Sequence, residues 1–157
     1  MDSFPFTAEE WSCVRDAALA VVYAALAEDT ILRASWFEEL QCWLSELRAK
    51  YGLHPLLLET EADFTENAAE RVVLYEQAKQ ASLAGGWVTY TIRTSLARVV
   101  LEELGDARRA LQELLACRDE IMACADDSER KEWQELQRAC FRRTACAPSL
   151  SLQCRWK

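Results

Sequence analysis

The segment FTAEEWSCVRDAALAVVYAALA, residues 6–27, carries the local signals of a long helix. Thr7 and Glu10 have the spacing of a capping box, and Phe6 and Trp11 have positions that can staple the first turn. The helix body carries two apolar stripes, a large one of Trp11, Val14, Ala18, Val22 and Leu26 and a small one of Cys13, Ala17, Ala20, Ala24 and Ala27. Because no charged residue lies within residues 17–27, we expect this helix to be central in the fold.

The composition predicts an all-α fold. Glycine (4) and proline (3) are scarce among the 157 residues, whereas Ala, Leu, Glu and Arg, which lose least on entering a helix, dominate. With 51% hydrophobic and 28% charged residues, the chain is globular rather than disordered. We predict a single all-helical domain over residues 1–146, with five to six antiparallel amphipathic helices packed as α-hairpins. Residues 147–157 have no periodicity, which predicts a mobile C-terminal tail.

Periodicity and end signals predict further helices over about residues 30–51, 65–84, 88–104, 106–125 and 126–144. In the first two of these helices the predicted inward-facing residues are Phe37, Leu40, Leu44, Leu47 and Tyr51, and then Val72, Tyr75, Ala78 and Ser82 with Ala69, Val73 and Ala81 beside them. In the last three they are Ile92, Leu96, Val99 and Val100, then Ala110, Leu111, Leu114, Cys117, Ile121 and Cys124, and finally Trp133, Leu136, Cys140 and Phe141. Residues 87–94, WVTYTIRT, alternate as a strand does. We favour a helix there because a lone strand has no partner for its backbone groups.

The segment HPLLLETEADF, residues 54–64, holds the only histidine and three carboxylates. Because it follows Gly52 and contains a proline, we interpret it as a joint between helices, with His54 as a capping or packing residue. A metal or catalytic role for His54 with Glu59 or Glu61 is the alternative. A carboxylate site for a hard cation, built from Glu59, Glu61 and Asp63, is a further alternative.

The net charge of −8 is unevenly distributed, since residues 1–64 carry twelve acidic and four basic residues. Residues 138–157 carry five basic residues and no acidic one. This overall acidity argues against nucleic acid as the main partner. The longest uncharged apolar stretch in the first half has 11 residues, short of the roughly 20 that cross a bilayer, and the N-terminus lacks a basic signal region. We therefore expect a cytoplasmic protein with no membrane association.

Seven cysteines do not predict a disulfide scaffold, because their number is odd and no export signal precedes them. Cys140, Cys146 and Cys154 crowd the C-terminal end without a nearby histidine, which is not a zinc pattern. We interpret the cysteines as structural thiols.

Residues 96–117, LARVVLEELGDARRALQELLAC, resemble one tetratricopeptide-type helical hairpin. The Gly105-Asp106 turn resembles the turn between the two helices of that repeat, and Ala110, Leu114 and Cys117 match its small, large and small positions. Thr94 and Arg98 depart from the pattern, which prefers an aromatic and a small residue there. The resemblance, over about residues 88–125, implies an interaction scaffold of stacked α-hairpins.

These features predict a non-catalytic protein that binds a protein or peptide, or a second copy of itself as a homodimer. We predict no cofactor and no catalytic residue, because the sequence contains no nucleotide loop, no metal-ligand cluster and no nucleophile with its base. Trp87 stands beside a glycine pair, and together with Tyr90 and Arg93 it is the predicted contact surface. The alternatives are a small acidic antidote or regulator that masks a basic partner, and a carboxylate metal-binding helical bundle.

Overall fold

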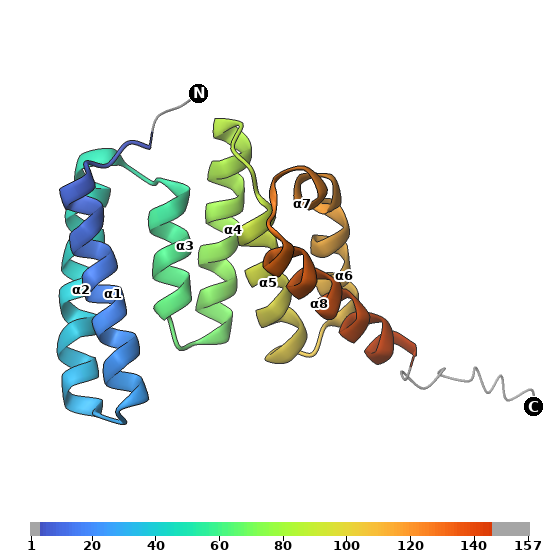
Figure 1. Cartoon of the computed structure of the whole chain (residues 1–157), viewed down its shortest axis with the longest axis horizontal. Helices are drawn as coiled ribbons and strands as arrows, with labels where there is room; N and C mark the ends of the chain where they lie inside the picture. The colour runs from blue at the N-terminus through green and yellow to red at the C-terminus, as the bar shows by residue number, and fades with distance from the viewer. Residues whose placement is uncertain (1–3, 146–157) are drawn as a thin grey trace, which may run out of the picture. The chain divides into compact units, whose positions relative to one another are not determined.

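The computed structural model describes residues 4–145, and over this range the chain forms eight α-helices and no strand (Figure 1). They are α1 (Ala8–Leu26), α2 (Thr30–Tyr51), α3 (Pro55–Phe64), α4 (Ala68–Gly85), α5 (Tyr90–Glu102), α6 (Ala107–Ala116), α7 (Arg118–Cys124) and α8 (Asp127–Ala145). The predicted all-α class is confirmed. The predicted number of five to six helices is too low, because residues 54–64 contain a helix and residues 106–125 form two. None of the described helices is both long enough and apolar enough to cross a membrane.

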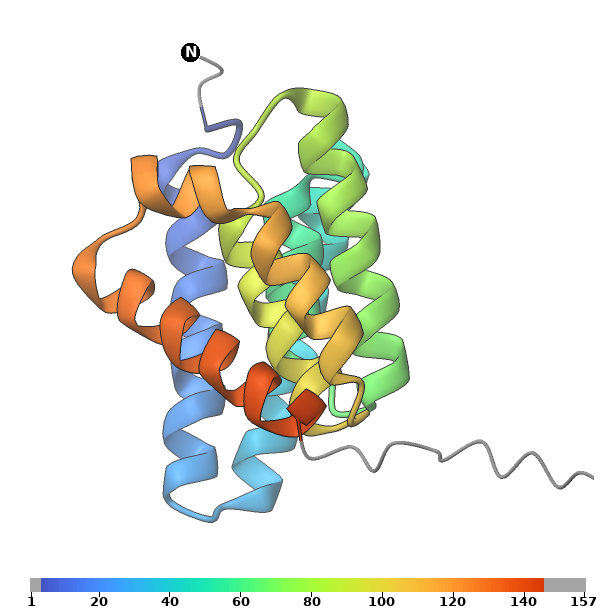
Figure 2. The ribbon, with the colours of Figure 1, turned by 90° about the vertical axis from the view of Figure 1, so that its right-hand side faces the viewer.

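The helices cluster into two compact units, one ending at Trp87 and one beginning at Val88. In the first unit α1 pairs with α2, α3 pairs with α4, and α2 also contacts α3. In the second unit α5 pairs with α6, and α8 lies against α6 (Figure 2). The predicted packing as α-hairpins is therefore confirmed, whereas the single domain over residues 1–146 stays a prediction. The predicted tail, residues 147–157, lies outside the described residues.

The N-terminus of α1 forms as its local signals predict. The Thr7 side chain accepts a hydrogen bond from the Glu10 backbone N–H at 3.1 Å, and the Glu10 carboxylate accepts one from the Thr7 N–H at 2.8 Å. The Phe6 and Trp11 rings stack with their centroids 5.6 Å apart. Both the capping box and the staple are confirmed, which fixes where the first helix begins.

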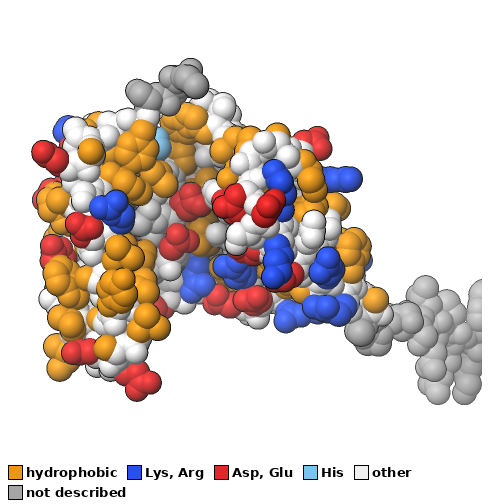
Figure 3. Space-filling view, viewed as in Figure 1, with side chains coloured by type: hydrophobic (Ala, Val, Ile, Leu, Met, Phe, Trp, Pro, Cys, Tyr) orange, Lys and Arg blue, Asp and Glu red, His pale blue; other side chains and the backbone are white. Residues whose placement is uncertain are grey.

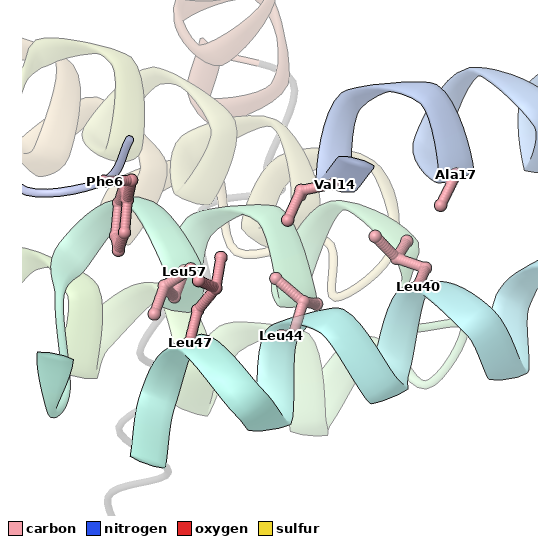
Figure 4. Packing of buried hydrophobic residues seen from close by; sticks show 7 residues of the cluster. All are labelled: Phe6, Val14, Ala17, Leu40, Leu44, Leu47 and Leu57. Carbon is pink, nitrogen blue, oxygen red and sulfur yellow. The ribbon is translucent and has the colours of Figure 1, made fainter. Parts of the chain in front are cut away.

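The first hairpin is held by a seam between one face of α1 and one face of α2. Val14 and Ala17 of α1 lie opposite the buried leucines of α2 (Figure 4). The residues of this core cluster are Phe6, Val14, Ala17, Leu40, Leu44, Leu47 and Leu57. Gly52 ends α2 at φ 75°, a conformation that glycine adopts at little cost. Burying each large apolar side chain contributes about 1.5–3 kcal/mol, so this seam is the main source of the hairpin's stability.

The predicted central position of α1 is wrong. Its buried residues are Val14, Ala17, Val21 and Ala24, whereas Val22 and Leu26 of the predicted large stripe are 42% and 76% exposed. Successive residues of a helix point about 100° apart, and the face through the alanines docks on α2 because small side chains allow close approach. Of the large stripe, Val14 is buried on this face, whereas Val22 and Leu26 are turned away. In this unit α2 is the one extensive neighbour of α1.

The segment predicted as a joint forms helix α3. His54 is its N-cap, with Nδ1 accepting the Leu56 backbone N–H at 3.3 Å, and Pro55 occupies the first turn. A proline fits there because the first N–H groups of a helix have no partner within the helix. Leu57, Leu58 and Ala62 are buried. The prediction that His54 caps is confirmed, and the prediction that residues 54–64 only join two helices is wrong.

Helix α4 begins after Asn67, slightly later than predicted, because the Asn67 side chain accepts the N–H groups of Ala69 and Glu70. Of its predicted inward-facing residues, Val72, Tyr75, Ala78 and Ser82 are buried and Ala81 is half-buried. The prediction is wrong for Ala69 and Val73, which are exposed. Gly86 ends the helix in the left-handed conformation at φ 70°.

In the second unit, the helix favoured over residues 88–104 is confirmed as α5. Asp106 caps α6 as predicted, accepting the Arg109 N–H at 3.0 Å. The predicted single helix over residues 106–125 is wrong, because the backbone leaves the helical conformation at Cys117 with φ −105° and ψ 10°. Cys124 and Phe141, both predicted to face inward, are exposed. Phe141 follows the buried Cys140 directly, so its side chain points about 100° away from the buried face.

A candidate protein-binding cleft in the first unit

A cleft of about 880 Å³ lies in the first unit, where the turn end of the α1–α2 hairpin meets the turn between α3 and α4. It is lined by Val21, Val22, Ala25, Leu26, Thr30, Arg33, Ala34, Phe37, Asp63, Phe64, Thr65, Glu66, Asn67, Glu70 and Arg71. In Figure 3, hydrophobic side chains crowd over this end of α1 and α2. The cleft is therefore built by residues that are up to 50 positions apart in the chain.

The walls of the cleft are apolar and come from α1, α2 and α3. Val22, Ala25 and Leu26 of α1 contribute one wall, and Phe37 of α2 and Phe64 of α3 contribute others. Such a concentration of exposed apolar side chains is unusual on a monomer and marks a binding surface or a ligand groove. The signal for it in the sequence is the uncharged stretch over residues 17–27, which is apolar on more faces than one neighbouring helix can cover.

The rim of the cleft is polar and ordered by its own contacts. Arg33 of α2 forms an ion pair with Glu66 in the α3–α4 turn, with Nη2 and Oε1 2.6 Å apart. Arg71 donates from Nε to the Thr65 carbonyl at 2.8 Å and from Nη2 to the Glu66 carbonyl at 3.1 Å. The Asp63 carboxylate accepts the Tyr75 hydroxyl. These contacts hold the α3–α4 turn in place beside α2.

Acidic residues outnumber basic ones around the cleft. The acidic residues are Asp63, Glu66 and Glu70 in the lining and Glu28 and Asp29 in the turn between the lining residues Leu26 and Thr30, and the basic residues are Arg33 and Arg71. Glu28, Asp29, Glu66 and Glu70 are exposed to solvent. The field at the cleft therefore favours a positively charged neighbour.

The predicted contact residues Trp87, Tyr90 and Arg93 have partners within their own units. Trp87 belongs to the first unit, where its ring lies 4.8 Å from the His54 ring between centroids. Tyr90 and Arg93 belong to the second unit, where the Tyr90 hydroxyl lies 3.3 Å from the Glu129 carboxylate and Arg93 Nη1 lies 2.5 Å from Glu113. Burial, with the Glu129 charge, raises the pKa of Tyr90. The role of these residues in partner contact stays a prediction.

His54 packs between aromatic rings. The Phe6 and Trp87 rings lie 5.0 and 4.8 Å from its ring between centroids. Burial lowers the pKa of His54, and its Nδ1 is already occupied as a helix cap. These contacts assign His54 a packing and capping role.

The carboxylates of the same segment are spread along α3 and have different partners. Glu61 pairs with Arg48 of α2, and Asp63 accepts the Tyr75 hydroxyl. Within residues 4–145, no group of three or more His, Cys, Asp or Glu side chains is arranged to hold a metal ion. The structure therefore does not bring Glu59, Glu61 and Asp63 together as one site.

The described cysteines differ in their exposure to solvent. Cys117 and Cys140 are buried, and burial raises the pKa of both thiols, that of Cys117 to about 11. A thiol in this state is a poor nucleophile at neutral pH because the thiolate is the reactive form. Cys42 and Cys124 are exposed, and Cys13 is half-buried. Cys146 and Cys154 lie outside the described residues.

Comparison with known protein families, curated proteins and solved structures yields no match to this chain. The tetratricopeptide resemblance therefore stays a prediction from the sequence.

Proposed function

We propose that this chain is a non-catalytic interaction protein whose cleft binds an apolar helix face, flanked by basic residues, on a partner protein. The observation that carries the proposal is the apolar cleft of about 880 Å³ with an acidic surround. Covering its walls removes apolar surface from water, which contributes about 25 cal/mol for each Å² buried.

The polar groups at the cleft favour a protein segment over a small polar ligand. Binding sites for small polar molecules present a few polar groups that converge on the ligand. Here the rim groups Arg33, Glu66 and Arg71 already pair with each other or with backbone carbonyls. In the described chain, the buried side-chain atoms without a hydrogen bond are Arg48 Nε and Thr94 Oγ1, and neither residue lines the cleft. The cleft can therefore recognise a partner mainly through its apolar surface and shape, as in proteins that bind a helix in a groove.

The acidic residues around the cleft favour a partner helix whose apolar face is flanked by basic residues. With five acidic and two basic residues at and beside the cleft, a helix with lysine or arginine flanks is attracted and an acidic helix is repelled. An acidic antidote or regulator that masks a basic protein is the second candidate function, and the same charge excess favours it. Strong salt dependence of the association rate, with little apolar contribution to affinity, would distinguish that second function.

The test uses two model peptides, an amphipathic helix of leucine and lysine and its counterpart of leucine and glutamate. Fluorescence anisotropy of the labelled peptides should show that the full chain binds the lysine peptide and not the glutamate peptide. Ala25→Glu places a charge in the apolar wall, and it should weaken binding about tenfold or more. This loss cannot come from repulsion, because the added carboxylate attracts the lysine peptide.

Ala49→Glu is the matched control, since Ala49 is exposed on α2 and does not line the cleft. It should bind the lysine peptide as the unmodified chain does. Equal binding by the Ala25→Glu variant, or no binding of either peptide by the unmodified chain, would reject the cleft as the binding surface.

A further inference from the structure

Helix α1 carries a second apolar face, which shares Leu26 with the walls of the cleft. Leu19, Tyr23 and Leu26 are 44%, 65% and 76% exposed. They are spaced by four and three residues, and on a helix they lie opposite the face of Val14, Ala17, Val21 and Ala24 that is buried against α2. We call Leu19, Tyr23 and Leu26 the outer seam.

The spacing of the outer seam is the one that helix–helix packing requires. Apolar residues alternating at four and three positions keep one stripe of a helix against a partner helix. The positions beside the seam, Ala20, Val22 and Ala27, are small or apolar, so two backbones can approach closely. In a coiled coil, charged residues at these flanking positions usually determine which helix can pair with which. Here the flanking positions are uncharged, so no charge opposes pairing with an identical helix.

We infer that the outer seam binds the outer seam of a second copy of this chain, with the two α1 helices antiparallel across a two-fold axis. The net charge of −8 makes most contacts between two copies repulsive. The outer seam lies within residues 17–27, which carry no charge, so two copies meet there without that cost. A two-fold axis brings the same patch together from both copies, and an apolar stripe of large side chains is complementary to itself.

The charges at the two ends of the seam favour the antiparallel arrangement. In that register Leu19 lies opposite Leu26 of the second copy. The Arg15–Asp16 ion pair, which has no net charge, lies beside the turn that holds Glu28 and Asp29 of the second copy. Arg15 is exposed on α1, and Glu28 is exposed in the turn. A parallel pair would instead place the turns with Glu28 and Asp29 of the two copies beside each other, which is repulsive.

The seam predicts a weak dimer. It is about two helical turns long and presents less surface than the roughly 800 Å² per partner of tight complexes. We therefore expect dissociation in the micromolar range. The dimer surface shares Leu26 with the walls of the cleft, and the flanking residue Val22 also lines the cleft.

Sedimentation equilibrium of the full chain, from low micromolar to submillimolar concentration, tests the inference. The mass should rise from one chain to two. The double variant Leu19→Glu/Tyr23→Glu should remain one chain throughout, because four carboxylates would meet in the dimer. Its circular dichroism and melting curve should match those of the unmodified chain, since both side chains are exposed.

The matched control is Val73→Glu/Leu83→Glu, which adds the same charge at two exposed apolar positions of α4. It should dimerise as the unmodified chain does. The charge register has its own test: Arg15→Glu should weaken the dimer a few-fold, and adding Glu28→Arg should restore it. A single-chain mass for the unmodified protein at every concentration, or dimerisation of Leu19→Glu/Tyr23→Glu, would overturn the inference. Ala25→Glu should leave the dimer intact, which separates this outcome from that of the cleft.

Discussion

Helices α1 and α5 each begin the first hairpin of their unit, but they differ in how much of their apolar surface is covered. In α1, four residues of 19 are buried, whereas in α5 seven of 13 are buried. Helix α5 packs against α6, α7 and α8, and α1 packs extensively against α2 alone. An apolar helix with one neighbour leaves apolar faces in water. The proposed binding surfaces therefore lie on the first hairpin, and we expect the second unit to contribute more to stability.

The polar contacts of the two units differ in the same direction. In the second unit Arg93 and Glu113 pair at 2.5 Å with side chains only 15% and 13% exposed, and Trp133 Nε1 donates to the Leu114 carbonyl at 2.9 Å. In the first hairpin the polar contacts between α1 and α2 are nearer the surface and lie at one end. There the Glu10 carboxylate accepts hydrogen bonds from Lys50 Nζ at 2.5 Å and from the Tyr51 hydroxyl at 2.7 Å. The other end of that hairpin holds the cleft.

The largest effect should come from removing the same side chain in the two regions. Leu96→Ala in α5 deletes a fully buried side chain and should lower the free energy of unfolding by about 2–5 kcal/mol. Leu26→Ala in α1 deletes a mostly exposed one and should cost less than about 0.5 kcal/mol. Urea denaturation followed by circular dichroism measures both. Similar losses of unfolding free energy at the two positions would contradict the difference in burial between α1 and α5.

Breaking the ion pairs should produce the next largest contrast. Arg93→Met removes the Arg93 guanidinium from the largely buried Glu113 carboxylate, and it should cost about 2–3 kcal/mol. Arg33→Met removes the exposed pair with Glu66 and should cost no more than about 1 kcal/mol. Denaturant titration of both variants checks the order, and a larger loss for Arg33→Met would reverse the assignment of stability to the second unit.

Acid should act on the first hairpin through Glu10. The Lys50 ammonium, with the Thr7 N–H and the Tyr51 hydroxyl, lowers the pKa of Glu10 from 4.5 to about 2. A carboxyl group with a lowered folded-state pKa stabilises the fold above its ordinary pKa, and this contribution is lost as the pH falls from 4.5 towards 2. Glu10→Gln should therefore lower the melting temperature at neutral pH. Between pH 4.5 and 2, the melting temperature of this variant should fall less than that of the unmodified chain. Glu9→Gln, at an exposed neighbour, is the control for loss of one carboxylate. If the melting temperature of Glu10→Gln depended on pH as that of the unmodified chain does, the stabilising contact of Glu10 with Lys50 and Tyr51 would be refuted.

The smallest effects should come from the two hairpin turns. Glu28, in the α1–α2 turn, has φ 57°, and Gly105, in the α5–α6 turn, has φ 71°. A side chain in this left-handed region costs about 1 kcal/mol, offset in part by the greater freedom of glycine in the unfolded chain. Glu28→Gly should therefore stabilise by about 0.5 kcal/mol, and Gly105→Ala should destabilise by about 1 kcal/mol. Thermal melting of the two variants shows whether each substitution stabilises or destabilises the fold. A change in the same direction for both would contradict backbone strain at Glu28.

Local signals predicted most of the helix ends. The capping box at Thr7, the Gly52 stop and the Asp106 cap all act within one turn of chain, and the structure confirms each of them. The break at Cys117 has no such signal, because apolar periodicity continues across it from Leu114 to Ile121. Only the packing of α6 and α7 within the second unit places a bend there.

By itself, the sequence determined that the chain is helical, where most helices begin and end, and that residues 17–27 carry more apolar surface than one contact can cover. Capping, glycine stops and 3.6-residue periodicity are local, so they can be recognised without knowing any neighbour. Tertiary structure decided which face of α1 meets α2 and which faces stay uncovered. It also formed the cleft, because α1, α2, α3 and α4 supply its walls and rim from distant parts of the chain. The choice between two apolar faces depends on close approach of backbones through small residues, and that energy exists only when both helices are in place.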